Sequence, residues 1–124
     1  MRRLVLLVED SETAVLMMRM QLELLGYRVT IARNGAEAVA KAAAELPDII
    51  IMDMQMPVMS GMEAAAQIRQ NPKTKSIPIL AATAKAMSGD REKCLASGCD
   101  AYLAKPFTHR VLGAEIQKLL KDSP

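Results

Sequence analysis

Residues 49–53 read Ile49-Ile50-Ile51-Met52-Asp53, and this stretch decides the fold. Four apolar residues follow one another without a polar interruption, which is typical of a strand buried on both faces of a parallel sheet. The strand ends at a carboxylate and runs into a loop containing Pro57, which lacks the N–H needed to continue a ladder. Open α/β sheets carry their chemistry at the carboxyl ends of such strands. Asp53 is therefore the first candidate for a functional residue.

Length and composition limit the class of protein. The chain has 124 residues, the size of one domain, and we expect residues 1–124 to form a single core. The 51% hydrophobic content is spread over short runs, none near the ~18 apolar residues of a membrane span, and the N-terminus has no signal-peptide pattern. A net charge of +2 with scattered Lys and Arg does not favour nucleic-acid binding. We expect a cytoplasmic protein without nucleic-acid or membrane partners.

Strand-like and helical patterns alternate five times along the chain. This alternation predicts an α/β fold, a doubly wound (βα)5 parallel sheet with helices on both faces. The spacing leaves the strand order open, although 2-1-3-4-5, the flavodoxin-like order, is the common solution for five such units. We expect strands at 4–8, 28–32, 49–53, 77–82 and 101–103, and helices after Ser11, after Asn34-Gly35, after Gly61, over 90–97 and after Thr108. In the second helix Leu46 is expected on the inner face with Ala38 and Ala42.

Polar side chains follow several of the predicted strands. All the strand-to-helix connections of a parallel sheet emerge at one edge, so these side chains are expected to meet there. They are Glu9, Asp10, Asp53, Thr83 and Lys105. Clustered carboxylates repel one another, and Mg²⁺ relieves this repulsion with carboxylate, water and phosphate oxygens as ligands. A lysine and a hydroxyl can hold further phosphate oxygens, and a carboxylate can act as a nucleophile. The set fits transfer of a phosphoryl group onto Asp53.

These residues, together with the Met56-Pro57…Ser60-Gly61 loop and Lys105-Pro106, carry a family resemblance. The sequence resembles the receiver domain of two-component response regulators over essentially its whole length. The segment 84–98 and the MPVMSG loop look most like receivers attached to hybrid sensor kinases. The resemblance also implies the strand order 2-1-3-4-5.

The resemblance implies a role for each matching residue. Asp53 matches the phosphoacceptor, and Glu9, Asp10, Asp53 and the Gln55 backbone carbonyl match the ligands of Mg²⁺, with Mn²⁺ as an alternative ion. Glu9 stands where the family more often has Asp, and its longer side chain can reach the metal through water. Thr83 and Lys105 match the groups that bind the phosphoryl oxygens, and Lys105–Pro106 is expected to be a cis peptide.

The resemblance also implies how a signal enters and leaves. Thr83 and Tyr102 match a switch pair, and Lys85 occupies a position that tunes phosphoryl lifetime, where a cation can either hinder or order the attacking water. The donor would be a histidine kinase or a histidine phosphotransfer protein. The output face would be built from helix 90–97, strand 101–103 and the last helix, and would bind a downstream protein or a second copy.

Several alternatives remain open at this point. An aspartyl-phosphate phosphatase of the haloacid dehalogenase kind also places a nucleophilic Asp at a strand end, but needs a second Asp where this chain has Gln55. A degenerate receiver that serves only as a protein-binding scaffold is the other alternative. We expect no free-standing turnover enzyme, although a receiver assists its own phosphorylation and dephosphorylation.

Three residue groups have a structural interpretation beside a functional one. Cys94 and Cys99 form no recognisable metal motif, so we expect buried, reduced thiols. Tyr102 can also be an ordinary half-buried aromatic residue. The ten Met residues fit flexible core filler, or alternatively an adaptable partner surface.

Overall fold

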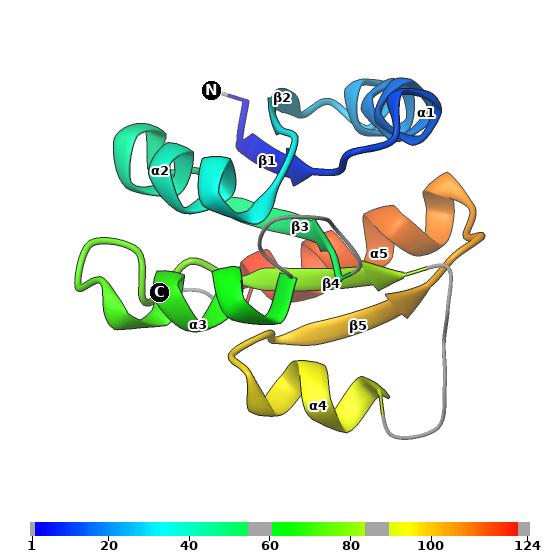
Figure 1. Cartoon of the computed structure of the whole chain (residues 1–124). Coiled ribbons are helices and arrows are strands. Elements are labelled where there is room, and N and C mark those ends of the chain that lie inside the picture. Colours follow the sequence, from blue (N-terminus) through cyan, green and yellow to red (C-terminus); the bar gives the residue numbers. More distant parts are fainter. Residues whose placement is uncertain (1, 55–60, 84–89, 122–124) are drawn as a thin grey trace.

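The computed structural model describes residues 2–54, 61–83 and 90–121, in which strands and helices alternate five times (Figure 1). The strands form one sheet in the order β2-β1-β3-β4-β5, with every neighbouring pair parallel. The doubly wound flavodoxin-like fold and its strand order are therefore confirmed. The strands are β1 (Leu4–Val8), β2 (Arg28–Ala32), β3 (Ile49–Asp53), β4 (Ile79–Thr83) and β5 (Ala101–Ala104).

Helices cover both faces of the sheet (Figure 1). They are α1 (Glu12–Leu24), α2 (Gly35–Glu45), α3 (Gly61–Gln70), α4 (Asp90–Ala96) and α5 (His109–Lys121). Side chains begin three of them, because Ser11, Asn34 and Thr108 accept hydrogen bonds from first-turn N–H groups. No helix in the described ranges is long and apolar enough to cross a membrane.

The alternation of side chains along each strand divides the core into two layers. In β3, Ile50 and Met52 face one layer, while Ile49 and Ile51 face the other. The first layer also contains buried residues of α2, α3 and α4, and the second contains those of α1 and α5. All four apolar residues of β3 are fully buried, as the uninterrupted apolar run predicted. The central position of β3 fixes Asp53 at the middle of one sheet edge.

Besides one-residue differences at the ends of β4, α4 and β5, two predicted boundaries were wrong. The strand expected at 77–82 begins at Ile79, because the Ile77 N–H donates to Thr74 in the preceding turn and Pro78 has no N–H. Leu46 lies outside α2 in a left-handed conformation, with φ of 48°, and its side chain is 54% exposed. The helix therefore ends at Glu45, two residues before the Pro47 that was expected to close it.

The amino end of the sheet is held by two acids that accept backbone hydrogen bonds. The Leu4 N–H donates to Asp48 Oδ2 at 2.7 Å, and the Ile79 N–H donates to Asp100 Oδ2 at 2.8 Å. Arg69 at the end of α3 donates to Asp100 Oδ2 at 2.5 Å. Its other N–H groups donate to the carbonyls of Gly98, Lys75 and Ile77 at 2.6–2.9 Å. Arg69 thus ties α3 to the segments that lead into β4 and β5.

Strand β2 is one of the two edge strands of the sheet, and β5 is the other. Lys41 from α2 donates from Nζ to the Ile31 carbonyl of β2 at 2.5 Å, and Thr30 donates to Glu45 at 3.3 Å. Polar side chains of α2 therefore cover part of the strand edge.

Candidate functional site

The register of the strands brings the predicted site residues together at the carboxyl edge. Val8 of β1 pairs with Met52 of β3, so Glu9 and Asp53 are the next residues on adjacent strands. Thr83 of β4 pairs with Ala104 of β5, and the Lys105 N–H donates to the Thr83 carbonyl at 2.8 Å. Four residues far apart in the sequence therefore end neighbouring strands on the same side of the sheet.

Glu9, Asp10 and Asp53 form a carboxylate cluster. One oxygen of each lies within 4.8 Å of the others. Glu9 is buried, Asp53 is half-buried and Asp10 is exposed, so the cluster opens to solvent on one side. Three carboxylate oxygens at this spacing are hard donors that suit a divalent cation such as Mg²⁺. The chemistry of the donor set fits the metal that the sequence implied.

The Glu9 carboxylate has a partner at each oxygen. Lys105 Nζ donates to Oε1 at 2.6 Å, and the Asp10 N–H donates to Oε2 at 3.2 Å. Burial alone would raise the pKa of Glu9, but hydrogen bonds with Asp53 and Lys105 and the Lys105 charge together hold this pKa below its ordinary value. Glu9 is therefore held as a carboxylate although its side chain is buried.

Three further predicted residues lie on the last two strands of the sheet or just after them: Thr83 on β4, Pro106 after β5, and Tyr102 on β5. Thr83 is buried at the end of β4, next to Lys105. The Lys105–Pro106 peptide bond is cis, as the resemblance implied. Tyr102 is half-buried on β5, where it packs against the core layer shared with α4. Its role as a switch residue stays a prediction.

Part of the predicted site lies outside the described residues. This holds for Gln55, for Lys85 and for the loop residues Met56, Pro57 and Ser60. Cys94 and Cys99 are buried thiols at the end of α4 and before β5, as expected.

Gly61 was predicted only as the residue that ends the loop, but it is packed against Asp53 and Met54. A Cβ atom at Gly61 would lie 2.7 Å from the Asp53 carbonyl oxygen, 2.9 Å from Met54 Cα and 2.6 Å from Met54 Cε. Because these contacts include backbone, any larger residue would displace the end of β3. No periodicity in the sequence signals such a contact.

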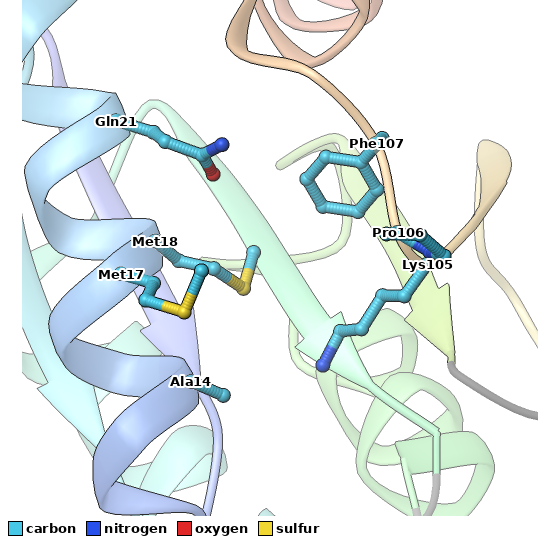
Figure 2. Close-up of a pocket in the computed structure, with 7 residues that line it drawn as sticks. All are labelled: Ala14, Met17, Met18, Gln21, Lys105, Pro106 and Phe107. Atoms are coloured by element: carbon cyan, nitrogen blue, oxygen red, sulfur yellow. The ribbon is translucent and has the colours of Figure 1, made fainter.

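A small apolar pocket lies beside Lys105, between α1 and the loop that precedes α5. Figure 2 shows Met17 and Met18 directed toward a space bordered on the other side by Phe107 and Lys105. The cavity volume is about 170 Å³. Met18 is buried, whereas Met17 is 60% exposed. The exposed apolar residues of α1 are Leu16, Met17, Met20 and Leu24. Met18 therefore fits the interpretation as core filler, and a partner surface at the exposed Met residues stays a prediction.

The geometry agrees with a family comparison. The sequence profile described as response regulator receiver domain matches residues 5–117. The chain belongs to this family. Receiver domains are modules of two-component signalling, and the assignment supports a place for this chain in that class of system.

Individual relatives cover nearly the whole chain. The polar-differentiation response regulator DivK of Brucella anthropi is 39% identical over 108 residues, which are 87% of this chain and 88% of that protein. The receiver domain of the sensor histidine kinase PA1611 from Pseudomonas aeruginosa is 38% identical, with a TM-score of 0.92, over 98% of this chain and 100% of that one. In that structure a magnesium ion is coordinated in the active-site cleft. The Vibrio cholerae chemotaxis protein CheY4 is 34% identical, with a TM-score of 0.89, over 96% and 99% of the two chains.

Proposed function

We propose that this receiver accepts a phosphoryl group on Asp53 and transmits its presence to a protein partner. The observation that carries the proposal is the meeting of Glu9, Asp10 and Asp53 within 4.8 Å, beside Lys105 and Thr83. Such a cluster is costly for stability because like charges repel, so it indicates a site for a positively charged or phosphorylated ligand.

The three carboxylates would hold Mg²⁺, or Mn²⁺ in its place, as in the magnesium-bound relative. When bound, the ion supplies positive charge that offsets the charge of the transferring phosphoryl group. The backbone carbonyl of Gln55 is proposed as a further ligand. Lys105 supplies a second positive charge, and the Thr83 hydroxyl supplies a hydrogen-bond donor.

The residues of the chain perform a simple displacement. One oxygen of the Asp53 carboxylate attacks the phosphorus of a phosphohistidine, and an O–P bond forms as the N–P bond breaks. The imidazole leaves with the electron pair of that bond and takes up a proton. Water later attacks the phosphorus of the aspartyl phosphate, the Asp53 O–P bond breaks, and Asp53 returns to its carboxylate as inorganic phosphate leaves. Lys85 is proposed to affect this rate. The chain thus assists its own modification and is not a free-standing turnover enzyme.

The donor is proposed to be a histidine kinase or a histidine phosphotransfer protein, which would dock on α1. The exposed Met17 of this helix lines the pocket beside Lys105, and Met side chains adapt to different partner surfaces. A partner helix placed over the pocket of Figure 2 would bring its histidine close to Lys105 and Asp53.

The output is proposed to leave through Thr83 and Tyr102. Thr83 would move toward the new phosphoryl group, and Tyr102 would follow it on the adjacent strand. The face formed by α4, β5 and α5 would then bind a downstream protein or a second copy of the chain.

The first experiment is intact-mass spectrometry after incubation with acetyl phosphate, with and without Mg²⁺. The wild type, the Asp53→Asn variant and a matched surface control, Glu92→Gln, are compared. A gain of one phosphoryl mass that needs both Mg²⁺ and Asp53, and is unchanged in Glu92→Gln, supports the proposal. No gain in the wild type, even with a cognate phosphohistidine donor, overturns it and favours the scaffold alternative.

A further inference from the structure

The contact between Lys105 and Glu9 has a consequence for the metal site. Lys105 Nζ lies 2.6 Å from Glu9 Oε1, and the Glu9 side chain is 3% exposed. The other Glu9 oxygen accepts the Asp10 N–H at 3.2 Å. Both oxygens of the buried acid are therefore already engaged by donors of the chain. A divalent cation bound to Glu9 would have to share or replace one of these contacts.

The lysine already supplies part of what a metal would supply. Its ammonium brings one positive charge to the cluster of Glu9, Asp10 and Asp53, whose oxygens lie within 4.8 Å of one another. Charge-assisted hydrogen bonds of this length, with little solvent around the acid, are among the strong ones. The resting site is thus partly neutralised before any metal enters.

The reach of Glu9 makes this contact. An Asp at this position would be one methylene shorter, so its carboxylate would fall short of the Lys105 ammonium from the same backbone position by roughly 1.5 Å. The backbone of Glu9 is fixed, since its N–H donates to the Ala32 carbonyl at 3.0 Å. The identity of residue 9 therefore determines whether the ammonium of Lys105 is held by this acid.

We propose that Glu9 is shared between Lys105 and the divalent cation, so that the two compete for it. In the resting site Glu9 holds Lys105. When the cation is bound, Glu9 releases Lys105, and the ammonium becomes available to the phosphoryl oxygens. Glu9 is then a positioning residue for Lys105 and weakens metal binding in the resting site. This inference rests on the proposed magnesium site.

Mg²⁺ affinity, measured by isothermal titration calorimetry in the absence of any phosphodonor, tests the competition. Lys105→Met removes the competing ammonium, and the Mg²⁺ dissociation constant is expected to fall at least tenfold. Glu9→Asp keeps the acid but shortens its reach, and the constant is expected to fall in this variant too. Lys118→Met, which removes an exposed cation of α5, is the matched control and should change the constant less than twofold.

A double-mutant cycle separates competition from simple charge repulsion, since removal of any nearby cation favours Mg²⁺. If Lys105 and Mg²⁺ compete for Glu9, the increase in Mg²⁺ affinity caused by Lys105→Met falls below threefold when Glu9 is replaced by Gln. If charge repulsion alone is responsible, Lys105→Met increases the Mg²⁺ affinity by the same factor in the Glu9→Gln background, and the inference is overturned. An unchanged dissociation constant in Lys105→Met also overturns it.

Nitrogen NMR of the lysine side chains gives an independent readout. The Lys105 ammonium signal should shift on addition of Mg²⁺ in the wild type and stay in place in Glu9→Asp, where the contact is already lost. If Mg²⁺ binds by calorimetry but the signal does not move, the competition is wrong and the metal site stands. If neither the wild type nor Lys105→Met binds Mg²⁺, the proposed metal site itself is wrong.

Discussion

The two ends of the sheet handle charge in opposite ways. At the amino end, Asp48 and Asp100 each accept a backbone N–H and each face an arginine, Arg3 at 4.0 Å and Arg69 at 2.5 Å. At the carboxyl end, three carboxylates lie together, and Lys105 forms an ion pair with Glu9, one of them. Acids are balanced one by one at the first end and left in excess at the second.

The difference separates stability from function within one sheet. A balanced acid with a backbone partner holds the strand ends in place. A surplus of carboxylates lowers stability, and a sequence retains it when the site must bind a cation or a phosphoryl group.

Replacing Asp53 with Asn should abolish phosphorylation, because the amide cannot form the acyl phosphate. The same change removes one of three clustered like charges, so the free energy of unfolding should rise by about 1 kcal/mol. Chemical denaturation without metal measures the second effect. A large loss of stability would show that Asp53 balances its surroundings as Asp48 and Asp100 do, and would contradict the contrast.

Replacing Arg69 with Ala should lower the free energy of unfolding by about 3 kcal/mol. The change removes the donors to three carbonyls and to Asp100, and leaves that acid with a single backbone N–H. Urea denaturation measures the loss. The control is Arg19→Ala, which breaks an exposed ion pair with Glu23 within α1 and should cost less than about 0.5 kcal/mol. Equal losses in both variants would refute the prediction.

Mg²⁺ should stabilise the wild type through the carboxyl end alone. At a hundred times its dissociation constant, binding to the folded state adds about 2.7 kcal/mol to the free energy of unfolding. Thermal unfolding with and without the ion measures this gain. The gain should vanish in a chain with Asp10 and Asp53 both replaced by Asn, and should persist in Arg69→Ala. Stabilisation that survives loss of both acids would place the ion elsewhere.

Alkaline pH should weaken the amino end through Cys99. Burial, followed by the nearby Cys94, raises the pKa of the Cys99 thiol from 9.0 to about 12 in the folded state. As the pH rises, the unfolded chain loses the Cys99 proton before the folded chain does. The contribution of the buried neutral thiol to the free energy of unfolding is therefore complete below pH 9 and is lost as the pH rises toward 12. By pH 10 the free energy of unfolding has fallen by about 1.4 kcal/mol through this group. Chemical denaturation between pH 8 and 10 should show that the free energy of unfolding falls less steeply with pH in Cys99→Ala than in the wild type. Equal slopes in the two proteins would count against the shifted pKa.

Sequence patterns predicted the sheet because its strands carry strong local signals. The apolar run of β3 and the polar residues at the strand ends were enough to place Glu9, Asp53, Thr83 and Lys105 at one edge. The order of the strands came from the family resemblance, since spacing alone does not distinguish one order of five parallel strands from another. The register in the structure then confirmed their proximity.

Contacts that depend on side-chain reach could not be predicted. The bond from Lys105 to Glu9 joins residues 96 positions apart, and Arg69 gathers carbonyls from two separate segments. The close packing of Gly61 on Asp53 depends on where α3 begins relative to β3. Such contacts follow from packing in three dimensions and have no periodic signature in the chain. The start of β4 was misplaced for a local reason, since Ile77 hydrogen-bonds within the preceding turn.

The contact of Lys41, from helix α2, with the edge strand β2 has a consequence for behaviour at high concentration. Its ammonium occupies the Ile31 carbonyl, which a strand from another molecule would need in order to extend the sheet. Addition of such a strand would require this charge to be displaced first. The Lys41 side chain therefore opposes the addition of strands from other molecules to this edge, which is the first step of fibre growth.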